Sequence, residues 1–224
     1  MKIQSCLIII LLALTSQVIC LKLSARKVSN LDDKPFLMIY EDERVITGRG
    51  IAISGIVTRG KLKAGDTVEI VGLRETKTVQ VSEVQGSNVK DGSVRSGDAQ
   101  ILFKNLNRDD LEKGMIIAQP GSIKAYSKFE ADVELLSEED GGTSIPIFTG
   151  QSKKLNFWMG FFYGKIEKIL SEDGSELEEF GAGNKAKLSV SLTNQIAMEV
   201  GTEFTIRVGL KDKVIGSGKV TKLI

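Results

Sequence analysis

The sequence predicts an all-β protein built from two consecutive antiparallel barrels. Short segments rich in β-branched residues recur about every 8–12 residues, which is typical of barrels rather than of layered α/β folds. Glycine and aspartate separate these segments, and helical periodicity is almost absent. A chain of 224 residues, 42% of them apolar and 26% charged, is long enough for two domains with separate cores.

Six segments carry the clearest strand signal. They combine β-branched or alternating residues with glycine or aspartate at their ends. They are residues 68–71, 77–81, 100–103, 186–192, 203–208 and 213–220. Residues 186–192 alternate most regularly, as expected for a strand with one buried face. Only one helical turn is expected, at residues 107–114, ended by Gly114.

A run of turn-forming residues, Pro120-Gly121-Ser122, interrupts the strand pattern and is the best position for a domain boundary. We therefore place one barrel at residues 31–122 and a second at residues 124–224. The sequence contains no internal repeat or low-complexity tract.

The first twenty residues have the pattern of a signal peptide. Lys2 is followed by an apolar run at residues 7–14, and Val18 and Cys20 give a plausible cleavage site before Leu21. The run is shorter than the ~20 residues that span a bilayer. We therefore expect a secretory or extracellular protein with no membrane attachment after cleavage. An uncleaved anchor and a buried N-terminal helix are the alternatives.

Residues 21–30 are basic and contain no acid, and we interpret them as a solvated linker. The same composition occurs in transit peptides. The alternative is therefore a two-part leader that directs the chain to a plastid or another organelle.

Composition excludes several classes of function. Thirty basic residues nearly balance 29 acidic ones, which argues against a general polyanion binder. The chain has no histidine, and its two cysteines, Cys6 and Cys20, both lie in the leader. The usual nucleophile–base pairs and the thiolate or imidazole metal sites are therefore missing. We expect no catalytic residue, no metal and no cofactor.

A nucleotide-binding P-loop is also absent. Such a loop needs Gly-x-x-x-x-Gly-Lys-Ser/Thr, because its backbone amides and lysine hold the phosphates. No such string occurs, so we expect this chain alone not to bind GTP. Asn107-Arg108-Asp109-Asp110 is interpreted as a solvated turn.

Two groups of motifs resemble one family, bacterial or organellar elongation factor Tu. Its second domain is resembled by Pro35-Phe36-Leu37-Met38, Glu41-Asp42, Gly48-Arg49-Gly50 and residues 64–72, and its third by residues 129–142, 196–199 and 204–207. The resemblance covers residues 31–224 and implies two six-stranded barrels packed together. The GTPase domain that comes first in the family has no counterpart here, so we expect the chain to lack it.

The resemblance also implies where a charged tRNA would bind. In the family the second domain holds the aminoacyl end, and the third touches the T stem. Glu41 and Asp42 match the acidic pair beside the aminoacyl group, and Ser54 keeps the hydroxyl of a threonine.

Other positions depart from the family pattern. Arg44 replaces a phenylalanine, Gln85 a glutamate, Asn88 an arginine and Ala99 an asparagine. Each lost hydrogen bond costs ~0.5–1.5 kcal/mol, and ~1.4 kcal/mol is a tenfold change in affinity. We therefore expect aminoacyl-tRNA binding to be lost or weakened.

An aromatic run at residues 157–163 is the candidate surface for a protein partner. On a single strand, Phe157, Met159 and Phe161 would face one side, with Trp158 and Phe162 on the other. We assign the first face to the core and place a partner surface at Trp158 and Phe162. The alternative is that both faces are buried, one of them against the neighbouring domain. Trp158 also replaces an arginine that meets tRNA phosphate in the family.

The sequence thus predicts a non-catalytic tandem-barrel binding module that enters the secretory pathway, with an unidentified protein partner. The alternative is an organellar translation component that binds aminoacyl-tRNA or a factor partner in concert with a separate GTPase domain.

Overall fold

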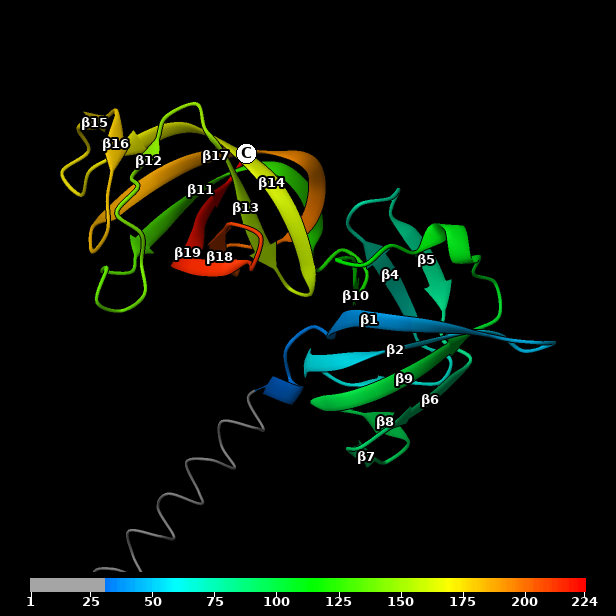
Figure 1. Ribbon diagram of the computed structural model, residues 1–224. Coiled ribbons are helices and arrows are strands. Elements are labelled where there is room, and N and C mark those ends of the chain that lie inside the picture. The colour runs from blue at the N-terminus through cyan, green and yellow to red at the C-terminus, as the bar shows by residue number, and fades with distance from the viewer. Residues whose placement is uncertain (1–30) are drawn as a thin grey trace, which may run out of the picture.

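A computed structural model describes residues 31–224. The expected signal peptide at 1–20, with both cysteines, and the expected linker at 21–30 lie outside the described residues. Strands dominate, and they form two units that meet along one side (Figure 1). Among residues 31–224, no helix is long and apolar enough to cross a membrane.

The first unit consists of ten strands and one 3₁₀ turn. Its elements are β1 (Leu37–Ile46), β2 (Gly50–Arg59), β3 (Leu62–Lys63), β4 (Thr67–Val71), β5 (Lys77–Gln80), β6 (Glu83–Gly86), β7 (Val89–Lys90), β8 (Ser93–Val94), β9 (Gly97–Phe103), η1 (Arg108–Asp110) and β10 (Ile116–Ala118).

The second unit consists of nine strands. They are β11 (Lys124–Leu135), β12 (Ile147–Phe148), β13 (Ser152–Phe157), β14 (Gly160–Leu170), β15 (Glu176–Leu177), β16 (Glu179–Phe180), β17 (Lys185–Met198), β18 (Glu203–Val208) and β19 (Lys213–Leu223).

The second unit is a closed antiparallel barrel. Strands pair in the order β13-β18-β19-β11-β17-β14, and β14 pairs back to β13, which closes a ring of six. Alternation along β17 gives the barrel its inner face: Ala186, Leu188, Val190 and Leu192 are buried, while Lys187, Ser189 and Ser191 between them are more exposed. The six-stranded barrel expected at 124–224 is confirmed.

The first unit differs from the closed six-stranded barrel that we expected. Its main sheet has seven strands in the order β5-β4-β10-β1-β2-β9-β6, and a second sheet contains β3, β8 and β7. The end strands β5 and β6 are each four residues long and do not pair with each other. Instead, β6 lies against β8 and β3.

Each unit has its own apolar core. The first is built around Ile53, Ile101 and Phe103, and the second around Phe129 and Phe157. These cores lie on either side of Pro120-Gly121-Ser122, where the boundary stays a prediction. A helical turn is present within the expected residues 107–114 as η1, but it ends at Asp110 with Leu111 as its cap rather than at Gly114. The backbone amide of Asn107 donates to Asp110 Oδ2 at 2.8 Å.

A third apolar cluster joins the two units. It contains Leu37, Val71 and Ile116 of the first unit together with Ala197 of the second. Beside it, the guanidinium of Arg59 holds the carboxylate of Glu199 through two contacts of 2.5 and 2.9 Å. Apolar packing and a two-contact ion pair therefore hold the units together.

Candidate binding surfaces

A row of polar side chains crosses the outer face of the first unit. The strand register places Asp42 opposite Ser54, Ser54 opposite Gln100, and Gln100 opposite Gln85. The row therefore runs over β1, β2, β9 and β6. The amide of Gln100 donates a 3.2 Å hydrogen bond to the Ser54 hydroxyl oxygen. Register thus brings together two residues that the family resemblance singled out, Asp42 and Ser54.

The third expected residue, Glu41, lies at an irregularity in the β1–β2 pairing, between Tyr40 and Asp42. A bulge of this kind changes the direction of neighbouring side chains. Within residues 31–224, neither Glu41 nor Asp42 accepts a hydrogen bond or forms an ion pair through its carboxylate. Both groups are therefore available to a cationic ligand.

Two of the replaced positions do not face this surface as the resemblance implied. Ala99 is only 5% exposed, because its side chain points into the core, while the next residue, Gln100, points outward. Asn88 donates to the carbonyl oxygen of Ser96 at 3.3 Å and so holds a turn. Gln100 is the outward residue of the row, and the period-two alternation of β9 is the signal that could have identified it.

A basic groove of about 510 Å³ lies under the β1–β2 hairpin. Arg49, Lys104 and Arg108 line it, and no carboxylate does. Two of these cations have acidic partners: Arg49 contacts Glu83 at 2.5 Å, and Arg108 contacts Glu43 at 2.9 Å. Lys104 forms no ion pair among residues 31–224, so the groove offers an unpaired cation to an anionic ligand.

The base of the same hairpin is fixed by a buried tyrosine. The hydroxyl of Tyr40 donates to the carboxylate of Glu43, and Arg108 approaches the same carboxylate. The hydrogen bond from Tyr40, followed by that from Arg108, lowers the pKa of Glu43. Burial, reinforced by Glu43, raises the pKa of Tyr40. The arrangement keeps Glu43 ionised and orients Arg108 at the groove.

The aromatic run at residues 157–163 is not one strand, as we expected, but a tight hairpin. Strand β13 ends at Phe157 and β14 begins at Gly160, and these two residues pair. Trp158 and Met159 form the turn, and Trp158 has a φ of +51°. The chain reversal changes which residues face outward.

The two residues expected to bind a partner lie against the first unit instead. Phe162 is 6% exposed and belongs to the barrel core. The indole N–H of Trp158 donates to the carbonyl oxygen of Ala197 at 2.9 Å, and its ring packs on the cluster between the units. Phe162 is thus buried and Trp158 partly buried, as the alternative expects, whereas Met159 and Phe161 of the other face are exposed.

The exposed aromatic residues are their neighbours. Phe161 and Tyr163 are 48% and 59% exposed on the outside of β14. The register sets Lys154 opposite both Tyr163 and Arg207. The ammonium of Lys154 lies 4.3 Å, and the guanidinium carbon of Arg207 5.7 Å, from the ring centroid of Phe161. We call these four residues the aromatic–basic face.

Lys154 is held in this position by Asp212, whose carboxylate lies 2.6 Å from its ammonium. The adjacent Lys153 is half-buried, and burial lowers its pKa. Lys154 and Arg207 therefore supply the positive charge of the aromatic–basic face.

The comparison with known families bears on this second unit. Residues 122–224 match the family model described as the elongation factor Tu C-terminal domain. Residues 122–224 form an elongation factor Tu-like β-barrel. The match agrees with the resemblance stated from residues 129–142, 196–199 and 204–207. The resemblance of residues 35–72 to the second domain of elongation factor Tu stays a prediction.

Proposed function

We propose that this protein is a non-catalytic, translation-factor-like binding module with a weakened hold on aminoacyl-tRNA. The elongation factor Tu-like barrel supports the first part of the proposal. The polar row of the first unit supports the second part, because beyond Asp42 it offers only the neutral groups of Ser54, Gln100 and Gln85.

Weak binding follows from the chemistry of this row. Glu41 and Asp42 can attract the ammonium of an aminoacyl group, but exposed ion pairs contribute only ~0.2–1 kcal/mol each. The Ser54 hydroxyl already accepts a hydrogen bond from Gln100. No cation or aromatic ring stands in the row itself to hold the terminal nucleotide.

A titration with aminoacyl-tRNA and with the same tRNA after deacylation tests this proposal. We expect dissociation constants above ~10 μM for both, with less than a tenfold difference between them. Asp42→Asn is expected to leave both values almost unchanged. Micromolar binding that prefers the charged form, and that Asp42→Asn abolishes, would contradict the proposal.

A second candidate function is a translation-linked role in which the second barrel contacts RNA, in concert with a separate GTPase domain. The aromatic–basic face favours it, because exposed rings flanked by cations serve as stacking platforms for bases. The basic groove at Arg49, Lys104 and Arg108 would attract phosphate in the same way.

The two functions are separated by replacing Phe161 and Tyr163 with alanine in one variant. Loss of one stacking ring costs ~1–3 kcal/mol, so an RNA-binding face predicts at least a ~30-fold weaker complex with the double variant. Lys165→Gln, on the outside of the same strand, is the control. Equal RNA affinities for all three proteins would remove this candidate.

We also propose that the protein enters the secretory pathway. The charge and apolar run of residues 2–14 support this route. Amino-terminal sequencing of protein recovered from cells tests it. A start at Leu21 in secreted material is expected, whereas recovery from an organelle would favour the two-part leader.

A further inference from the structure

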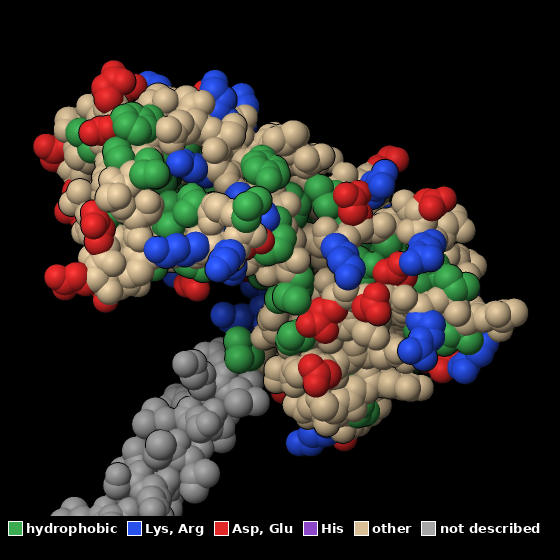
Figure 2. All heavy atoms as spheres, viewed as in Figure 1, with side chains coloured by type: hydrophobic (Ala, Val, Ile, Leu, Met, Phe, Trp, Pro, Cys, Tyr) green, Lys and Arg blue, Asp and Glu red, His purple; other side chains and the backbone are tan. Residues whose placement is uncertain are grey.

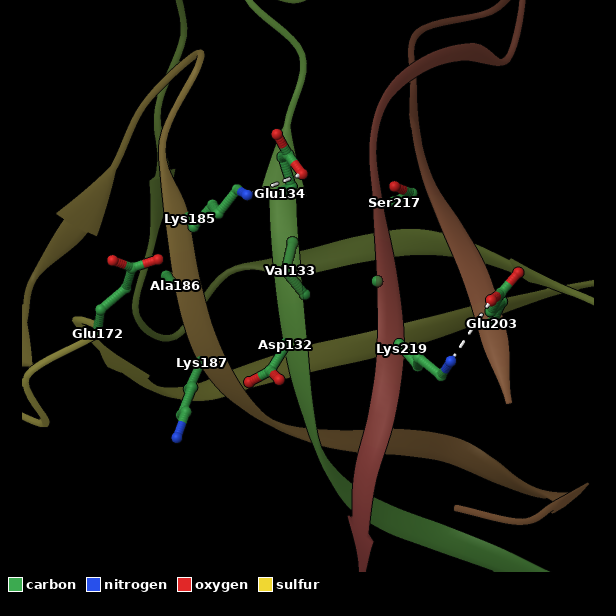
Figure 3. A pocket seen from close by; sticks show the side chains of 11 residues that line it. Asp132, Val133, Glu134, Glu172, Lys185, Ala186, Lys187, Glu203, Ser217 and Lys219 are labelled. Atoms are coloured by element: carbon green, nitrogen blue, oxygen red, sulfur yellow. Dashed lines mark ion pairs between the residues drawn. The ribbon is translucent and has the colours of Figure 1, made fainter. Parts of the chain in front are cut away.

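The outer face of the second barrel carries a trough. Its lining includes no residue of the aromatic–basic face and neither residue of the hairpin turn. The trough crosses β17, β11, β19 and β18 and encloses about 630 Å³ (Figure 3). A second hollow of about 400 Å³ continues towards β14. The two hollows share Asp132 and Lys187, which therefore lie where they meet.

The strand register explains why the sheet is hollow here. Val133 pairs with Ala186 on one side and with Gly218 on the other, and the side chains of Val133 and Ala186 are buried. The backbone of this row therefore forms the floor. Charged side chains of the two neighbouring rows form the walls, led by Asp132 and Glu134 on β11 (Figure 3).

Most of the wall charges have partners within the barrel. Glu134 pairs with Lys185 at 3.5 Å, and Glu203 pairs with Lys219 at 3.8 Å. Both contacts are near the upper end of ion-pair distances.

Three charged groups of the trough remain without a partner among residues 31–224. They are the carboxylates of Asp132 and Glu172 and the ammonium of Lys187. Asp132 lies opposite Lys187 in the register, yet their end groups do not form an ion pair. Figure 3 shows the end of the Lys187 side chain directed away from Asp132, with Glu172 on the far side of β17.

We propose that this trough is a binding site for a free basic amino acid of the lysine and arginine class. Two unpaired carboxylates and one unpaired ammonium are complementary to a ligand with two cations and one carboxylate. Lys187 would take the carboxylate of the ligand, and Asp132 and Glu172 its two cationic groups. The volume falls within the ~300–1,000 Å³ of small-molecule pockets, and the charged walls suit a ligand that is itself charged.

Titration of the full chain with L-arginine and agmatine, followed by two-dimensional NMR of the backbone amides, tests this site. Agmatine keeps both cations of arginine but lacks the carboxylate. We expect saturable shifts centred on residues 132, 172 and 187, with arginine binding more tightly than agmatine. L-citrulline, whose side chain is uncharged, is expected to bind more weakly than arginine.

Substitutions assign the roles. Lys187→Gln is expected to weaken arginine binding by about two- to fivefold, the range for an exposed ion pair, and not to weaken the binding of agmatine, which has no carboxylate. Asp132→Asn is expected to lower the affinity for both arginine and agmatine. Lys165→Gln removes the same charge from an exposed lysine outside the trough and is expected to change neither.

Two results would overturn the site. One is the absence of saturable shifts in the wild-type chain with arginine. The other is an equal change in arginine and agmatine affinity in Lys187→Gln, because agmatine has no carboxylate and an equal change shows that the ammonium of Lys187 does not contact that group. Neither result depends on whether the protein binds RNA.

Discussion

Trp158 and Ala197 are joined by a 2.9 Å hydrogen bond from the indole N–H to the carbonyl oxygen, and both residues pack on the apolar cluster between the two units. The bond orients a bulky side chain whose backbone has a positive φ, a conformation that is rare for such residues. Figure 2 shows apolar side chains on the surface near the place where the units meet. The hairpin tip is thus part of the contact between the units.

Trp158→Phe is expected to lower the free energy of unfolding by about 1–2 kcal/mol. The substitution keeps an aromatic ring but removes the N–H, and it leaves a carbonyl without its donor. Urea denaturation measures the change. Met159→Leu, at the exposed neighbouring turn position, serves as the control, and an equal effect of both substitutions would contradict the role of the hydrogen bond.

Arg59→Lys is expected to destabilise the chain by about 1–2 kcal/mol although it preserves the charge. Arginine makes two parallel contacts with Glu199 and donates from Nε to the carbonyl of Pro35, whereas lysine cannot reproduce this fork. A double-mutant cycle with Glu199→Gln isolates the coupling. Additive effects in that cycle would show that the pair contributes nothing between the units.

Gly114→Ala is expected to cost about 3 kcal/mol. Gly114 has a φ of +101°, and an added Cβ would stand 2.6 Å from Cζ of Phe162, so backbone strain and overpacking act together. Gly48 also has a positive φ, of +75°, but open space around it. Gly48→Ala is therefore the matched control, with an expected cost of about 1 kcal/mol, and equal losses would exclude the steric contribution.

Acid stability is expected to depend on Glu43. Its pKa is lowered in the folded protein from an ordinary value of 4.5, first by the hydrogen bond from Tyr40. A depressed folded-state pKa contributes stability above the unfolded pKa, and that stability is lost as the pH falls through the folded value. Tyr40→Phe should therefore flatten the decline in unfolding free energy below pH 4.5.

Denaturant titrations of wild type and Tyr40→Phe across the acid range measure this difference. Glu43→Gln should show the same flattening. Parallel curves of unfolding free energy against pH for wild type and both variants would contradict this prediction. They would show that Tyr40 does not stabilise the ionised carboxylate of Glu43.

The fold could be predicted where burial follows directly from alternation. Residues 186–192 show their buried face in the sequence, and β17 contains them. The closure of the ring, in contrast, depends on β13 pairing with β14 through a hairpin and also with β18, which is distant in the chain. In the first unit the four-residue strands β5 and β6 give too little sequence to show that they remain apart.

The candidate surfaces were predictable only in part. Asp42 and Ser54 were identified through the family resemblance, but the hydrogen bond from Gln100 needs the register of β2 and β9. The hairpin at Trp158 was missed because tryptophan is not a turn residue, and only Gly160 hints at a reversal. The aromatic–basic face joins positions 154, 161 and 207, which no local pattern connects.

The ring of six strands has a consequence for how this protein could associate through its backbone. Every ring strand already has a neighbour on each side, so a foreign peptide finds no unsatisfied amides and carbonyls there to extend. In the seven-stranded sheet of the first unit, in contrast, the edge strands β5 and β6 each have one side without a paired strand. Strand addition, domain exchange or fibril seeding through the main sheet of the first unit would therefore begin at β5 or β6.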